Sequence, residues 1–303
     1  MSRWFLRILL SLFVLGAAAY GLYRVEERHQ ASRLALAETV IDSSKAAPAS
    51  RETPATAASP AANSPADPSG KSGREGRGVL AAETALPLRS GEILDFRASV
   101  SQLSNVANLR LEVVERRNFL GKSVWHLQAF AHTENPLRFV FALDDQFDSY
   151  SDAATLHSMQ YELHLNERGQ KLDSVQRLTS SGNTPAAAGA VQTRVLPGTR
   201  DPLGMMQFLR TVDWSRTPEV RCPVYDGHKL YDVRANVAGS ASITVPAGTF
   251  DTSKIAICVF DNGAEMKDAS FALYLAKDPG KTPVLLEAVL PFASARVELN
   301  RIH

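Results

Sequence analysis

The chain has 303 residues, 45% of them hydrophobic, and a formal net charge of +1. These values are ordinary for a globular protein with one large or two small domains. No basic stripe with interleaved aromatic residues is present, so we exclude nucleic acid as a partner. No cysteine stands directly after the N-terminal apolar run, where a lipid-anchored lipoprotein would have one, and this argues against such an anchor.

Residues 4–23 are apolar apart from Arg7, Ser11 and small residues. About twenty residues at about 1.5 Å each span about 30 Å, the thickness of a bilayer core. Arg3 and Arg7 favour the cytoplasmic side, so the rest of the chain is exported. Residues 1–24 are therefore an inner-membrane transmembrane anchor or a signal peptide cleaved near Ala17-Ala18-Ala19. We expect a bacterial envelope protein, single-pass with a periplasmic domain, or periplasmic after cleavage.

Residues 25–85 are rich in Ala, Ser and Pro and almost lack large apolar side chains beyond residue 40. Such a segment buries too little surface to offset the entropy of ordering it. We predict a disordered linker over 25–85 that acts as a passive spacer. The periplasmic domain then covers 86–303.

The first half of that domain alternates apolar and polar residues in short segments, which is typical of β-strands. We predict strands over 92–100, 109–116, 123–132, 139–143, 146–150, 159–166 and 171–179. The long helices that join parallel strands are missing between them. The first half therefore predicts an antiparallel meander.

The second half opens with one helix. Asp201-Pro202 has the form of a helix cap followed by proline, and apolar residues at helical spacing predict a helix over 202–212. Period-two alternation then predicts a half-buried strand over 231–237, and 255–260 reads as a buried strand. Further strands are predicted over 270–276, 284–290 and 295–299. The fold class is mainly β, with a meander that closes on itself or curls across one short packed helix.

Several short motifs occur in an order that resembles the domain of unknown function (DUF) 3108 family of bacterial envelope proteins. They are Gly91-Glu92, Trp125 to Ala129, Asp148-Ser149-Tyr150 with Asp152, Asp201-Pro202-Leu203, Phe208-Leu209-Arg210, Asp226 to Val233, Val245 to Phe250 and Pro283-Val284. The resemblance covers about 86–300 and departs at Ser101 to Val106, where the family has a glycine-rich segment. It implies export and a β-rich domain, and it implies no reaction. By analogy with lipoprotein carriers, we expect a curved, half-open, barrel-like antiparallel sheet.

Cys222 and Cys258 are the two cysteines of the chain. Export places them in an oxidising compartment, where a disulfide is the default expectation. The alternative is two separately buried thiols. No Cys-x-x-Cys motif is present, so a redox-active pair is not expected.

No residue pattern indicates a catalytic, cofactor or metal site. His126, His132, His157 and His164 lack the spacing of zinc ligands, and Asp144, Asp145, Asp148 and Asp152 lack the glycine and closing glutamate of a calcium loop. Phosphate-binding loops, dinucleotide fingerprints and Gly-x-Ser-x-Gly elbows are absent. Asp201 is explained by its role as a helix cap.

The leading functional prediction is non-catalytic binding of an apolar envelope ligand, such as a lipid, or of an envelope protein partner on the concave face of the sheet. The large apolar residues that motivate this binding face are Phe139, Phe141, Phe147, Tyr161, Phe271 and Tyr274. An interior filled by its own side chains is the competing structural reading. The alternative functions are a scaffold role in an envelope assembly and a hydrolase with an unrecognised site.

Overall fold

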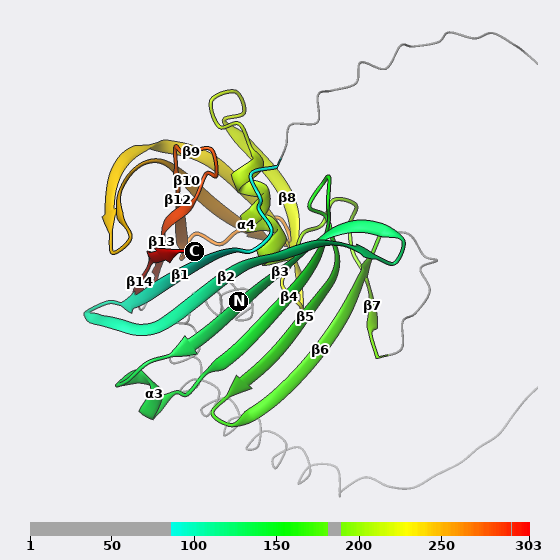
Figure 1. Ribbon diagram of the computed structural model, residues 1–303, viewed down its shortest axis with the longest axis horizontal. Coiled ribbons are helices and arrows are strands. Elements are labelled where there is room, and N and C mark those ends of the chain that lie inside the picture. The colour runs from blue at the N-terminus through cyan, green and yellow to red at the C-terminus, as the bar shows by residue number, and fades with distance from the viewer. Residues whose placement is uncertain (1–85, 181–188, 292) are drawn as a thin grey trace, which may run out of the picture. The chain divides into compact units, whose positions relative to one another are not determined.

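The computed structural model describes residues 86–180, 189–291 and 293–303 (Figure 1). The predicted anchor and linker lie outside these residues. Within them, no helix is both long enough and apolar enough to cross a bilayer.

Two successive meanders build one large sheet, and within each meander the strands of the main path follow their order in the sequence. The first meander contains β1 (Glu92–Val100), β2 (Leu103–Phe119), β3 (Lys122–Thr133), β4 (Asp144–Asp152), β5 (Ser158–Glu167), β6 (Gln170–Thr179) and β7 (Val191–Arg194). The second contains β8 (Glu219–Tyr225), β9 (Leu230–Val245), β10 (Gly248–Asp261), β12 (Ser270–Ala276), β13 (Pro283–Leu290) and β14 (Ala293–Ile302), and the short β11 (Ala264–Glu265) pairs only with β10. The mainly β meander expected from the sequence is thus confirmed.

The two meanders join where the first and last strands meet. β1 pairs antiparallel with β14 from Leu94 opposite Ile302 to Val100 opposite Ala295. All neighbouring strands are antiparallel except β6 and β7. The sheet is open, because its edge strands β7 and β8 do not pair with each other.

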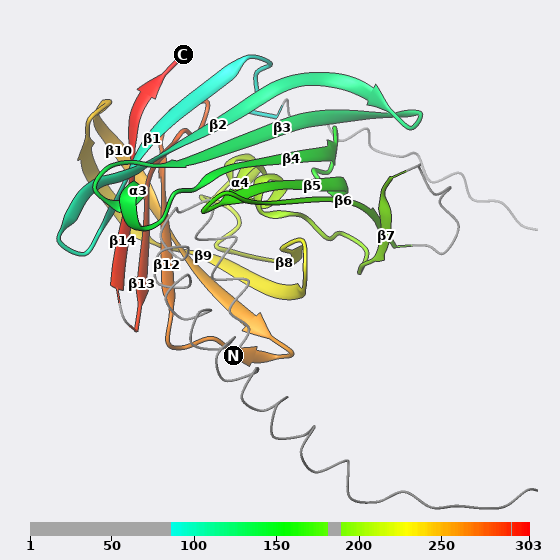
Figure 2. The same cartoon turned by 90° about the horizontal axis from the view of Figure 1, so that it is seen from below.

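The sheet curls, so that β8 and β9 face β4–β6 across the helix (Figure 2). Side chains connect the two ends of the curl: Tyr225 Oη donates to Gln176 Oε1, and Gln176 Nε2 donates to the carbonyl of Gly227. Gly227 has φ +92°, and a Cβ there would lie 2.9 Å from the side chain of Leu163. This turn therefore needs glycine both for its backbone and for its close approach to β5.

The expected helix is α4 (Pro202–Thr211), which begins and ends close to the predicted 202–212. Asp201 caps it: its Oδ1 accepts from the backbone N–H of Gly204 at 2.8 Å, and its Oδ2 accepts from Ser149 Oγ on β4. Because Ser149 lies on the inner face of the sheet, the cap also attaches the helix to that face. A Cβ on Gly204 would lie 3.0 Å from Ser151 Oγ, so the first turn of α4 touches β4.

Arg210 fixes the other end of α4. Its side chain is fully buried, and it forms two hydrogen bonds of 2.7 Å to the carboxylate of Glu92 on β1. It also donates to the Gln207 side chain and to the carbonyl of Gly280. Bidentate pairing of this kind fixes geometry as well as charge. Glu92, Asp201 and Arg210 belong to three of the short motifs noted in the sequence, and all three residues hold the helix against the sheet.

One predicted strand is wrong. Instead of a strand over 139–143, the chain forms the short helix α3 (Leu137–Val140), and Phe141 N–H donates to the carbonyl of Leu137. Pro136 stands at the helix start, where its missing N–H costs nothing. Phe141 and Leu143 are buried, which explains why the segment looks like a strand in the sequence.

Candidate functional site

The six residues expected to form an apolar binding face do not share one face. Phe147 and Tyr161 stack with ring centroids 6.5 Å apart and are fully buried on the inner side of the sheet. Phe141 and Phe271 belong to the same core. Tyr274 packs with Ala272 and Leu285 in a separate small cluster, and Phe139 is 85% exposed on α3.

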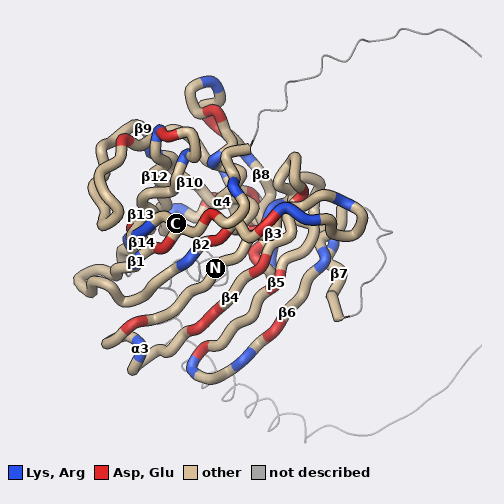
Figure 3. Tube along the Cα trace, viewed as in Figure 1, with Lys and Arg blue, Asp and Glu red and all other residues tan. Residues whose placement is uncertain are grey.

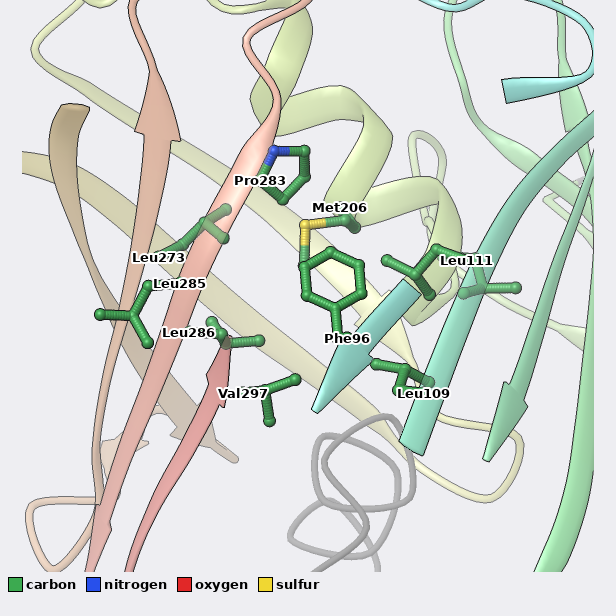
Figure 4. Close-up of a pocket in the computed structure, with 10 residues that line it drawn as sticks. Phe96, Leu109, Leu111, Met206, Leu273, Pro283, Leu285, Leu286 and Val297 are labelled. Carbon is green, nitrogen blue, oxygen red and sulfur yellow. The ribbon is translucent and has the colours of Figure 1, made fainter. Parts of the chain in front are cut away.

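The inner side of the curl is largely filled. A cavity of about 20 Å³ lies between β1–β2 and β12–β14, with Met206 of α4 beside it (Figure 4). Its lining is apolar and includes Phe96, Leu111, Leu286 and Val297. This space holds about one water-sized group. The described residues thus favour the competing reading, an interior filled by its own side chains.

The expected disulfide does not form. Cys222 on β8 lies opposite Val233 of β9, whereas Cys258 on β10 lies opposite Arg234 of β9. Successive residues of a strand point to opposite faces, so the two thiols lie on opposite sides of the sheet. Both are unpaired. Cys222 is buried against Met205, and burial raises the pKa of its thiol to about 11.

Three His–Asp pairs lie on the outer face of the first meander, opposite the face that packs on α4. His126 contacts Asp148 at 2.7 Å, and similar pairs join His132 to Asp144 and His164 to Asp173. Burial alone would raise the pKa of Asp148, but hydrogen bonds from His126, Gln128 and Gln146 outweigh it and lower the pKa. No serine hydroxyl is hydrogen-bonded to any of these histidines among the contacts of the described residues, so the pairs do not assemble a hydrolase triad.

Strongly buried acidic groups cluster under the start of α4 instead. Burial raises the pKa of Asp201 and also that of Asp226, and it raises the pKa of Tyr161 well above its ordinary value. Asp201 and Tyr161 are fully buried. Asp201 is occupied by the helix cap and its hydrogen bond to Ser149, and both side chains lie in the core, which is the arrangement of a structural cluster. In the described part of the chain, no group of three or more His, Cys, Asp or Glu residues is placed to hold a metal ion.

A groove of about 870 Å³ lies on the outer face of the sheet, and we call it the outer groove. Its walls come from β14, β1, β2 and β3 and from the loop after β3. The lining residues are Asp95, Phe96, Arg97, Asn105, Asn108, Leu109, Arg110, Glu112, Phe130, His132, Glu134, Asn135 and Asn300. Acidic and basic residues are interspersed along these strands (Figure 3).

An ion-pair cluster braces the middle of the outer groove. Arg110 Nε donates to Asp95 Oδ1 at 2.8 Å, and His303 Nε2 contacts Asp95 Oδ2 at 2.9 Å. Burial of the carboxyl would raise the pKa of Asp95, yet the hydrogen bonds from Arg110 and His303 dominate and lower it. Asp95 therefore stays ionised, and it connects β1 to Arg110 of β2 and to His303.

A second cluster braces the end of the outer groove near α3. Asn108 Nδ2 donates to Glu134 Oε1 at 2.6 Å, and Arg138 forms hydrogen bonds of 3.1 and 2.9 Å to the two oxygens of Asp144. Asp144 also contacts His132. Arg97, Glu112 and the side-chain amides of Asn105, Asn135 and Asn300 have no hydrogen-bond partner among the described residues. These groups are available to a ligand.

Sequence patterns did not single out the outer groove. Its polar residues alternate with core residues on β1 and β2, which is the ordinary pattern of a solvated sheet face. The one local signal is a β-bulge in β14 opposite Asp95 and Phe96, which places Asn300 outside the regular pairing. Such a bulge re-aims a side chain and is visible only once the strands are paired.

The fold and its surface define a mainly β domain with an open, curled sheet, a packed helix and a polar groove, without a recognised catalytic centre in its described part. The chain belongs to the family described as "Protein of unknown function (DUF3108)", whose model matches residues 95–300. The family resemblance drawn from the motifs is thus confirmed.

Solved structures give a more distant comparison. A β-barrel-like protein of domain of unknown function DUF1849 from Brucella abortus is 11% identical, with a TM-score of 0.46 over 70% of this chain and 97% of that one. A "putative lipoprotein" from Parabacteroides distasonis is 14% identical, with a TM-score of 0.34 over 72% of this chain and 97% of that one. No curated protein matches the chain.

Proposed function

We propose that this chain is a non-catalytic binding protein of the bacterial cell envelope that holds its ligand in the outer groove. Residues 4–23 attach it to the inner membrane, and residues 25–85 tether the domain. The observation that supports the proposal is the volume of the outer groove, about 870 Å³, against about 20 Å³ in the inner cavity beside Met206. Ligand sites in proteins are typically about 300–1,000 Å³ in volume.

The test is site-specific photo-crosslinking in cells. A photoreactive amino acid at Arg97, which is exposed in the outer groove, should give a discrete adduct by mass spectrometry. The matched control is the same amino acid at Arg221 on β8, where the side chain is 55% exposed and outside the groove. An adduct at both positions, or at neither, contradicts binding in the groove.

The sequence alone favoured an apolar ligand on the concave, inner face of the sheet, and binding there would require side chains of that face to move. A lipid chain would have to displace Met206 and widen the cavity beside it. Methionine is flexible enough to move, which makes the displacement testable. A lipid-sized mass adduct in native mass spectrometry, lost on Leu286→Trp, would favour the inner face over the groove.

A scaffold role is the second candidate, and exposed apolar residues at one end of the sheet favour it. The connections β1–β2, β3–β4, β5–β6 and β13–β14 lie at the same end, because antiparallel neighbours reverse direction. Large apolar side chains exposed near these connections are Leu103, Phe139, Val140, Leu172 and Val289. Clustered exposed apolar residues mark protein interaction sites.

The scaffold candidate predicts that Phe139→Ser with Val140→Ser shifts the protein from a large to a small species in native gels of gently solubilised membranes. Leu120→Ser is the control, since Leu120 is 54% exposed in the β2–β3 turn at the opposite end. Unchanged migration of the double variant would remove the scaffold role.

A further inference from the structure

We propose that the outer groove binds an uncharged, hydroxyl-rich saccharide. This proposal rests on the proposed function and names its ligand class. Its support is the charge of the groove, the hydrogen-bonding groups and the partly exposed ring of Phe130, since Phe96, the other phenylalanine of the lining, is buried.

The charges of the groove are nearly balanced and already paired in part. Its lining has two arginines, Arg97 and Arg110, and three carboxylates, on Asp95, Glu112 and Glu134. Arg110 is engaged by Asp95, and Glu134 accepts from Asn108. A polyanion would meet more negative than positive side chains here, and a polycation would find Asp95 already neutralised. The field of the groove therefore favours a ligand without net charge.

The free polar groups of the groove are mainly amides. The side chains of Asn105, Asn135 and Asn300 have no hydrogen-bond partner among the described residues. An amide offers two donor hydrogens and an accepting oxygen. A sugar hydroxyl likewise donates once and accepts twice, so amides match vicinal hydroxyls in either direction. A site that selects a charged group would instead present several arginines or lysines.

Phe130 supplies the apolar part of the site. It lies on the outer face of β3, opposite Arg110 of β2, and is only partly buried. An aromatic ring presents a negative face that attracts the positively polarised C–H groups of a sugar ring. A partly exposed phenyl ring among hydroxyl-binding amides is the combination that a saccharide needs.

The dimensions of the groove favour a chain of sugars over a single one. The groove crosses β14, β1, β2 and β3, which are neighbours in the sheet. Four strands spaced about 4.8 Å apart give a width of about 14 Å. This width exceeds one sugar ring, so an oligosaccharide segment is the expected ligand.

The test is saturation-transfer NMR with the full chain in mild detergent. The probe is a neutral tetrasaccharide of β-1,4-linked N-acetylglucosamine, and the comparison is a hyaluronan tetrasaccharide, in which every second sugar carries a carboxylate. We expect the neutral probe to bind more tightly. Phe130→Leu should weaken its binding about tenfold because the aromatic face is lost while the apolar volume is kept. Asn300→Ala should weaken it severalfold.

The matched control is Phe139→Leu, which makes the same phenylalanine-to-leucine substitution at an exposed residue outside the groove and should leave saccharide binding unchanged. Unfolding temperatures of the three variants show that the domain stays folded. Three results would each overturn the saccharide proposal: no saturation transfer to the neutral probe at millimolar concentration, tighter binding of the charged tetrasaccharide, or binding that is insensitive to both groove variants. A photo-adduct at position 97 without saccharide binding overturns only the ligand class, whereas the absence of both overturns the proposed function as well.

Discussion

The ion pair between Glu92 and Arg210 offers the sharpest test of how the helix is held in the fold. Glu92→Leu leaves the guanidinium of Arg210, which is fully buried, without its two 2.7 Å hydrogen bonds to carboxylate. Removing one partner of a buried pair costs about 3–5 kcal/mol. For a domain of this size, about 2–4 °C is lost per kcal/mol, so the unfolding temperature should fall by roughly 6–20 °C.

The reverse substitution should cost less, because the environments of the two partners differ. Arg210→Met leaves Glu92, whose side chain is 14% exposed and can reach water. We expect a loss of about 1–3 kcal/mol, the cost of a partly satisfied polar group. The double variant Glu92→Leu with Arg210→Met should lose clearly less than the sum of the single losses, since apolar side chains often replace a buried pair at little net cost.

Urea unfolding followed by circular dichroism measures all three variants. Glu219→Gln is the control, because Glu219 and Arg221 form an exposed pair whose loss should cost less than about 0.5 kcal/mol. A loss below about 1 kcal/mol for Glu92→Leu, or two single losses that simply add, would contradict this prediction. Either result would mean that packing alone, without the ion pair, holds the end of α4.

Three further predictions concern the helix and the cysteines. Gly204→Ala should destabilise the domain by about 1–3 kcal/mol in urea unfolding, because its Cβ would lie 3.0 Å from Ser151 Oγ. This loss should exceed the gain from alanine's better helix propensity. A stabilised variant would show that β4 shifts at little cost to make room for the methyl group. Burial raises the pKa of Asp201 above its ordinary value of 3.8, so the protonated carboxyl stabilises the fold at pH values below 3.8, and this contribution is lost as the pH rises through the raised pKa. Asp201→Asn does not titrate and should therefore gain stability relative to the parent protein over that pH range. A difference in unfolding free energy that stays constant with pH would contradict the raised pKa. Cys258 should react with a thiol reagent in the native protein, whereas the buried Cys222 should react only after unfolding. Reduction of the untreated protein should leave its mass unchanged. A gain of two hydrogens on reduction would show that a disulfide exists.

Much of the strand order followed from the sequence, because alternation marks a strand wherever one face is buried. The strands that begin at Glu92 and Ser270 were predicted with the observed bounds. The helix at Pro202 was predicted because its cap and its proline are local signals. The segment at Phe139 was misassigned, since burial of Phe141 and Leu143 gives a short apolar run in a helix or a strand alike.

Local signals by themselves determined the class of this protein: a β-rich domain of the DUF3108 family with one capped helix. Pairing decided the rest. Whether Cys222 can reach Cys258 depends on which residues of β9 they face, and the register between strands fixes that. The outer groove likewise requires β1 to meet β14, two strands about 200 residues apart in the chain. Such contacts depend on the sheet as a whole, because each strand's own residues fix only which of its faces is buried.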